Sequence, residues 1–230
     1  MKKTAAFLVL LFLSAPLLAE NDFGFRFGLK ASPNISWFRT ETRGYHNSGA
    51  DLGFSYGLIV DYEFAEYYSL TTGLNILRTG GTLKYNYIIP DGNFEGELTE
   101  KRREHNLRYV EIPMALKLST SEMGYITYYG QFGLGLGFRI HARANDRVSL
   151  PDGSSLRTSD VDISDNTRFL SAALVIGAGV EYNLGGRTSM LGGLTFKNGF
   201  SNVLDTRNPA VATRPSALNN HIEITLGVMF

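Results

Sequence analysis

The side chains in this sequence that could carry acid–base chemistry stand singly among apolar residues. Glu111, Glu181 and Glu223 each lie in a run in which apolar residues alternate with small or polar ones, and His141 and His221 lie in similar runs. Carboxylates and imidazoles are the usual general acids and bases of enzymes. A hydrolase or acyltransferase acting near the rim of the fold is therefore one hypothesis, although no Ser, His and acid fall at a recognisable nucleophile spacing.

Eight segments with a two-residue alternation would have to position these side chains, and no useful helical period appears after Ala19. Such alternation indicates strands that have one apolar face. The segments are 22–30, 51–62, 68–77, 107–118, 125–141, 169–182, 189–197 and 221–230. The sequence therefore predicts an all-β fold.

The polar face of these strands is unusual because it consists of glycines, small polar residues and single charges. The water-facing side of a soluble sheet would be rich in Lys and Glu, whereas only 19% of this chain is charged. Strands of roughly ten residues are long enough to cross a bilayer at a tilt. We therefore predict an eight-stranded antiparallel up-and-down transmembrane β-barrel with its apolar face toward lipid.

The predicted connections alternate strictly between short and long. The short ones are 63–67, 119–123 and 184–188, and the long ones are 32–50, 78–106, 142–167 and 198–218. Outer-membrane barrels have short periplasmic turns and long extracellular loops. This pattern predicts an integral outer membrane protein of a Gram-negative cell envelope. An aromatic girdle is expected near the short turns, from Tyr62, Phe64, Tyr67, Tyr68, Tyr125, Tyr182 and Phe230.

Nine charged residues fall on the predicted inward face. They are Arg26, Lys30, Asp61, Glu111, Lys117, Arg139, Glu181, Lys197 and Glu223. His141 and His221 are expected on the same face near the outer mouth. Side chains can fill an eight-stranded barrel, and an unpaired buried ion is costly, so we predict a salt-bridged interior. A small passive, porin-like channel is the alternative. Pro113 predicts a local bulge beside Glu111.

The two ends of the chain have distinct predicted roles, a signal peptide at the start and the last strand of the barrel at the end. Residues 1–19 have a basic start, an apolar run and a small residue at Ala19, as in a cleaved secretory signal peptide, which leaves 20–230 as the barrel domain. At the other end, residues 221–230 are predicted to form the strand that closes the barrel against the first. Its terminal aromatic, Phe230, resembles the signal that the barrel-assembly machinery reads.

Partners and cofactors are restricted by composition. The chain has no Cys and a net charge of zero, so thiolate metal sites and nucleic-acid binding are not expected, and we expect no metal and no cofactor.

The tips 89–92 and 150–153 both read Pro-Asp-Gly after an apolar residue, which favours turns. These hairpins are predicted to extend as strands above the membrane and to offer a surface for a protein partner. The charges at 100–104 are interpreted as solvated.

The stretch RYVEIPMALKL, 108–118, resembles the most recognisable strand of the PorT-like outer-membrane β-barrel proteins of Bacteroidota-type bacteria, through Tyr109, Glu111 and Pro113. FGLKASPNIS, GLIVDYEFAEYYSLTTGLNIL and GLGLGF resemble other parts of that family, although Ala31-Ser32-Pro33 departs from its usual glycine. The resemblance implies an eight-stranded outer-membrane barrel and no single activity. The paired interior favours a non-enzymatic, structural or partner-binding protein. The founding member of the family assists secretion of exported proteases, which implies an accessory role in secretion or envelope assembly.

Overall fold

The computed structural model describes residues 24–90, 92–206, 208, 210 and 214–230. The predicted signal peptide and Asp91 lie outside these residues. The described part contains ten strands and one short 3-10 helix. They are β1 (Phe25–Arg39), β2 (Tyr45–Gly49), β3 (Asp51–Ala65), β4 (Tyr68–Ile88), β5 (Leu98–Ser119), β6 (Ile126–Ser149), β7 (Ser155–Asp162), η2 (Ser164–Asn166), β8 (Leu170–Gly185), β9 (Thr188–Gly199) and β10 (Leu218–Met229). Among the described residues, no helix is long and apolar enough to cross a membrane.

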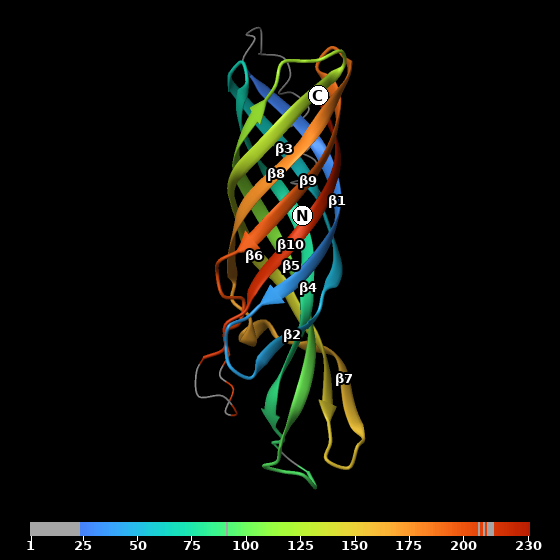
Figure 1. The fold of residues 1–230 in the computed structure, drawn as a ribbon, viewed down its shortest axis with the longest axis vertical. Helices are drawn as coiled ribbons and strands as arrows, with labels where there is room; N and C mark the ends of the chain where they lie inside the picture. The colour runs from blue at the N-terminus through green and yellow to red at the C-terminus, as the bar shows by residue number, and fades with distance from the viewer. Residues whose placement is uncertain (1–23, 91, 207, 209, 211–213) are drawn as a thin grey trace, which may run out of the picture.

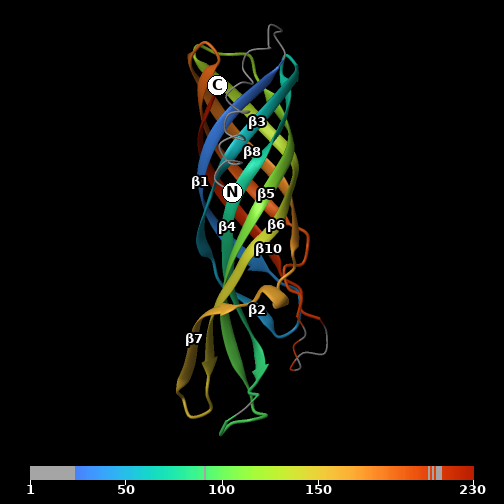
Figure 2. The ribbon, with the colours of Figure 1, turned by 180° about the vertical axis from the view of Figure 1, so that it is seen from behind.

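Eight of the strands close into a barrel in the order β1-β3-β4-β5-β6-β8-β9-β10, with every neighbouring pair antiparallel (Figures 1 and 2). β1 and β10 complete the ring, and Phe230 exchanges two backbone hydrogen bonds with Phe27 at 2.8 and 2.9 Å. Closure matters because a lipid core offers no water to an unpaired backbone group. The predicted fold class is confirmed, although β1 and β10 begin or end several residues beyond the predicted limits.

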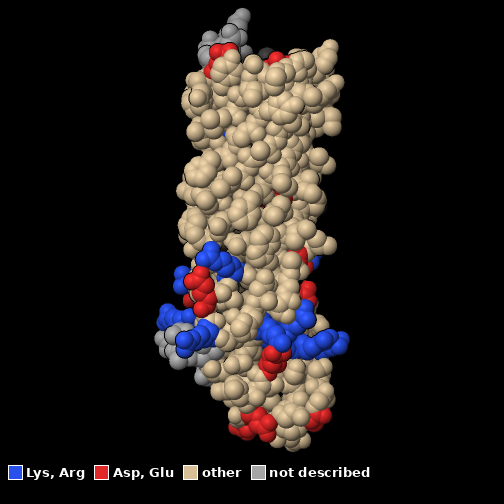
Figure 3. Space-filling model, viewed as in Figure 1, with Lys and Arg blue, Asp and Glu red and all other residues tan. Residues whose placement is uncertain are grey.

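The barrel wall turns its apolar side outward. Leu52 is 73% exposed and Leu226 is 62% exposed, and the middle of the visible face is almost free of charged side chains (Figure 3). The glycine-rich inner side leaves room for a few large groups. A Cβ on Gly193, for example, would overlap the hydroxyl of Tyr129, which lies inside the barrel. The predicted alternation and its direction therefore match the structure.

The two ends of the barrel differ. The turns β3–β4, β5–β6 and β8–β9 are short and lie at the end where the chain stops. At the other end β4, β5 and β6 continue well past the barrel, and β2 and β7 pair with their extensions. The result is a five-stranded layer in the order β2-β4-β5-β6-β7, which we call the projecting sheet (Figure 1). The predicted extension of both hairpins is confirmed.

Pro113 does not cause the predicted bulge beside Glu111. The β4–β5 register is the same on both sides of it, from Thr72↔Met114 to Asn75↔Glu111, and only the pairs between are missing. The Thr72 hydroxyl donates a hydrogen bond to the Pro113 carbonyl at 2.8 Å. The strand thus accommodates the missing N–H of proline with a gap in the ladder, without an inserted residue.

A bulge lies instead in β6, at Ile140. Arg108 pairs with His141 and Tyr109 pairs with Arg139, so Ile140 has no counterpart in β5. One extra residue reverses the inside–outside alternation for the rest of the strand. His141 is therefore exposed on the outside of the wall, and its predicted inward position is wrong.

Candidate functional site

Lys117 is the centre of an ion-paired network at the short-turn end of the interior, which we call the Lys117 network. Its Nζ donates to Asp61 Oδ2 at 2.7 Å and to Glu181 Oε1. Glu181 also accepts from Arg26 at 3.0 Å, and Arg26 approaches Glu63 at 3.5 Å. These residues come from β1, β3, β5 and β8, so the network crosses the barrel from wall to wall.

Neutral groups complete the bonding of the Lys117 network. Thr71 donates to Asp61 Oδ1 at 2.6 Å, and Ser189 donates to Glu181 Oε2 at 3.2 Å. The Lys117 ammonium also lies 4.8 Å from the ring centre of Tyr129. Buried ions need this kind of additional bonding to offset the loss of water.

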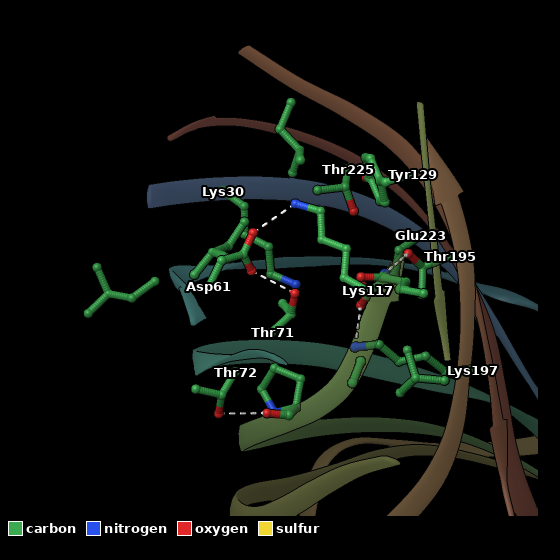
Figure 4. Close-up of a pocket in the computed structure, with 17 residues that line it drawn as sticks. Lys30, Asp61, Thr71, Thr72, Lys117, Tyr129, Thr195, Lys197, Glu223 and Thr225 are labelled. Carbon is green, nitrogen blue, oxygen red and sulfur yellow. Dashed lines mark hydrogen bonds and ion pairs between the residues drawn. The ribbon is translucent and has the colours of Figure 1, made fainter. Parts of the chain in front are cut away.

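A second ion-paired network, the Lys197 network, lies deeper in the barrel. Lys197 Nζ donates to Glu111 Oε1 at 2.5 Å and to Glu223 Oε1 at 3.2 Å, and His221 Nε2 lies 3.4 Å from the same Glu223 oxygen. All four side chains are buried. A cavity of ≈ 50 Å³ is lined by members of both networks and by Lys30 (Figure 4). Space of that size holds about one or two waters, which is too little for an open channel.

Seven of the nine predicted lumen charges thus take part in the two networks. Lys30 lines the cavity, and Arg139 is half-buried beside Tyr109. Neither has an ion pair within 4.0 Å among the described residues. Of the motif residues, Tyr109 and Glu111 point inward and Pro113 lines the cavity.

An apolar cluster closes the end of the barrel opposite the short turns. We call it the apolar plug, and it was not predicted. Its members are Phe38, Tyr45, Leu77, Leu83, Tyr85, Leu107, Tyr109, Ala142, Ala144, Ile163, Val203, Leu204 and Ala217. Tyr45 stacks on Tyr85 with ring centres 4.7 Å apart, and the ring of His105 meets Phe38 edge-on at 5.2 Å. Alternation within β4 could have identified this face, but Val203 and Leu204 come from a segment without a strand pattern.

A third charged cluster lies on the inner face of the projecting sheet beyond the plug. Asp146 accepts from Arg103 Nε at 2.6 Å and from Lys101 Nζ at 2.7 Å, and both Lys101 and Asp146 are buried. Burial opposes ionisation of Asp146, but the bonds from Arg103 and Lys101 outweigh it and hold the pKa of this carboxyl below its usual value. The interpretation of the charges at 100–104 as solvated is therefore wrong for Lys101 and Arg103, because the alternation of β5 continues through them.

His105 follows the same inward alternation and is fully enclosed. Burial, and then the nearby cation Arg103, lower the pKa of His105 to about 3, so the imidazole is neutral at physiological pH. Of the two predicted histidines, only His221 lies with the carboxylates, 3.4 Å from Glu223 Oε1. Glu111 lies in the lumen and His141 lies on the outside of the wall. Among the described residues, no three His, Asp or Glu side chains are arranged to hold a metal ion.

A closed antiparallel barrel with an apolar exterior and an ion-paired interior is an integral membrane β-barrel of the outer-membrane type. Residues 19–205 match the model of the outer membrane protein beta-barrel domain, and this chain belongs to that family. It lies in the lipid of the outer membrane. In this class short turns are periplasmic and long loops are extracellular, which predicts that the projecting sheet lies at the cell surface.

Solved structures show a similar arrangement at low sequence identity. Neisserial surface protein A is 15% identical, with a TM-score of 0.48, over 90% of this chain and 96% of that one. OprG from Pseudomonas aeruginosa is 11% identical, with a TM-score of 0.43, over 90% and 97%. The outer membrane protease OmpT from Escherichia coli is 9% identical, with a TM-score of 0.39, over 94% and 99%. No curated protein matches. At these values the likenesses indicate no role for this chain.

Proposed function

We propose that this protein is a non-conducting, non-enzymatic outer membrane barrel that binds a partner at the cell surface through its projecting sheet. The observation that supports this best is the closure of the interior at successive levels. The Lys117 network, the Lys197 network and the apolar plug each fill the lumen with bonded or packed side chains. What remains accessible outside the membrane is the sheet and its loops.

The test is electrical recording from the purified protein in planar bilayers. The expected result is no steady conductance, with a general porin inserted in the same way as the positive control. Steady channels that persist in the wild-type protein would overturn the proposal and favour the passive-channel alternative.

The rim-enzyme alternative has less support from the geometry. Of its five candidates, His141 lies on the outside of the wall, whereas Glu111, Glu181, Glu223 and His221 are buried inside the barrel. Glu111 is bonded to Lys197, and His141 accepts a hydrogen bond from Arg143 at 2.8 Å. A carboxylate and an imidazole placed this way have no common substrate position.

An accessory role in secretion or envelope assembly, as in the PorT-like proteins, belongs to the same proposal. Its test is co-purification from gently solubilised membranes, comparing the wild type with a variant in which Ser149–Ser155 is shortened to a tight turn. A partner that is lost only from the variant would support binding at the sheet. A partner recovered equally with both would place binding elsewhere.

The proposal includes recognition of β10 by the barrel-assembly machinery. Phe230 is exposed at the periplasmic end and paired through its backbone with Phe27. A Phe230→Ala variant keeps those backbone bonds, so a defect in assembly in cells without a defect in detergent refolding would support a recognition role. Equal assembly of both chains would contradict it.

A further inference from the structure

One row of residues crosses all five strands of the projecting sheet and carries basic side chains or histidine at every position. His46 of β2 pairs with Lys84 of β4, which pairs with Arg102 of β5. Arg102 pairs with Arg147 of β6, and Arg147 pairs with Arg157 of β7. Residues directly opposite one another in a sheet lie on the same face. We call this set the basic row.

The basic row faces away from the apolar plug. The residues next to it in the strands, such as Tyr45, Tyr85 and Asp146, are buried on the inner face. His46, Arg102, Arg147 and Arg157 are exposed, and the Lys84 side chain is 41% exposed. The row is therefore open to solvent along its whole length.

The basic row also stands clear of the lipid. Arg78, Arg108 and His141 are neighbours on the outer face and mark the edge of the apolar belt. From Arg108 to Arg102 the strand advances roughly 20 Å, so even a tilted strand lifts the row beyond the headgroup region. Charged side chains gather at this end of the molecule (Figure 3). A ligand of the row must therefore be reached from the aqueous side.

Local acids neutralise only part of this charge. Lys84 is paired with Glu100 at 2.7 Å, and Glu104 lies in the adjacent row between Thr82 and Asn145. Arg102, Arg147 and Arg157 have no ion pair within 4.0 Å among the described residues. Like charges on adjoining strands, about 4.8 Å apart, destabilise a sheet. A bound polyanion would remove that repulsion.

The shape and composition of this face narrow the ligand class. Guanidinium groups bind sulfate, phosphate and carboxylate in bidentate geometry. A row that crosses neighbouring strands suits a linear chain that carries one anion per repeat at an interval near the strand spacing. No aromatic residue occurs in the row or among its flanking pairs, which include Asn86, Glu100 and Ser149, so the face lacks the stacking groups of single-strand nucleic-acid sites.

We propose that the basic row binds an anionic polysaccharide, with Arg102, Arg147 and Arg157 contacting successive acidic groups. This rests on the proposal that the projecting sheet carries the binding function. The acidic groups could belong to the phosphorylated core sugars of lipopolysaccharide in the same membrane or to a free sulfated or uronic-acid glycan. Both offer the same chemistry to the row.

The test measures binding of fluorescent dextran sulfate and of purified lipopolysaccharide to the full protein in detergent micelles. The test variant is R102Q/R147Q/R157Q. The matched control is R43Q/R108Q/R168Q, which removes the same charge from exposed arginines outside the row. Losing three exposed ion-pair contacts predicts a loss of affinity of roughly 30-fold in the test variant, and little change in the control. Heat-modifiable gel migration of all three proteins verifies the fold.

The outcomes are decisive in both directions. Row-dependent binding of either probe supports the proposal, and the probe that binds identifies the source of the glycan. Equal losses in the two variants, equal binding of uncharged dextran, no binding by the wild type, or stronger row-dependent binding of single-stranded DNA would each overturn it. Bilayer recordings on the same preparation separate the two proposals. A closed barrel that binds neither probe contradicts the polysaccharide proposal alone, whereas a conducting barrel contradicts the proposed function.

Discussion

Replacing Lys117 by Met is expected to destabilise the barrel more than any loss of a surface charge. Lys117 is 4% exposed in its side chain and bonds both Asp61 and Glu181, so the variant leaves two buried carboxylates short of a cation. Removing one partner of a buried pair costs about 3–5 kcal/mol. With a urea slope of about 2 kcal/mol per molar, the unfolding midpoint should fall by roughly 1.5–2.5 M.

The assay is urea unfolding in detergent micelles, followed by the fluorescence of Trp37, the single tryptophan. Lys84→Met is the matched control because Lys84 pairs with Glu100 at the surface, where such a pair contributes about 0–1 kcal/mol. A second variant, K117M/D61N, also removes the charge of Asp61, which Lys117→Met leaves without a cation, while Arg26 still pairs with Glu181. It should therefore recover part of the lost stability. If Lys117→Met lowers the midpoint no more than Lys84→Met, the interior is hydrated and the reasoning fails.

Three further predictions concern the plug and the inner wall. Leu83→Ala should lower the free energy of unfolding by about 2–5 kcal/mol because Leu83 is fully buried in the plug. Leu98 is exposed, so Leu98→Ala should change that free energy little. Similar values for the two variants would show that the plug is not packed. His105 has a folded pKa of about 3 against about 6.5 when unfolded, so stability is complete above pH 6.5 and falls by up to about 1.4 kcal/mol per pH unit as the pH drops toward 3. In pH-dependent melting His105→Gln should flatten that slope, and an unchanged slope would contradict the assignment. Gly193→Val should block refolding because its side chain would overlap Tyr129, whereas the control Gly130→Ala adds a methyl group in open space. The heat-modifiable gel shift reports the folding of both variants. Normal folding of Gly193→Val would show that the lumen is less tightly packed than the structure indicates.

The sequence predicted the barrel well because its signals are local. A strand in lipid must alternate strictly, so Leu52, Phe54 and Tyr56 identified the outer face without any knowledge of their neighbours. The inward direction of Glu111 and Lys117 followed from the same period. Which charge meets which did not follow, because the pairing of Lys117 with Asp61 depends on barrel stagger and not on sequence order.

The errors have two physical sources. The Ile140 bulge moved His141 outside, and one inserted residue leaves no clear compositional mark. The sequence pattern favours solvated charges at 100–104, but Asp146 neutralises Lys101 and Arg103, and the alternation of β5 continues through both. The apolar plug was missed because it joins strand residues such as Leu107 to Leu204 in an irregular segment, a contact between distant parts of the chain.

Both proposals require the apolar side of the barrel wall to face lipid and the charged side to face the interior. Quenching of tryptophan fluorescence by brominated lipids tests this orientation most directly. Trp37 lies on the outer face of β1, stacked 6.3 Å from Phe196, and no other tryptophan competes with its signal. In vesicles of brominated phosphatidylcholine its emission should be strongly quenched, and in W37F/Y129W, where the indole sits inside the barrel, emission should persist. If the tryptophan inside the barrel is quenched and Trp37 is not, the apolar exterior does not face lipid and the interior is not closed.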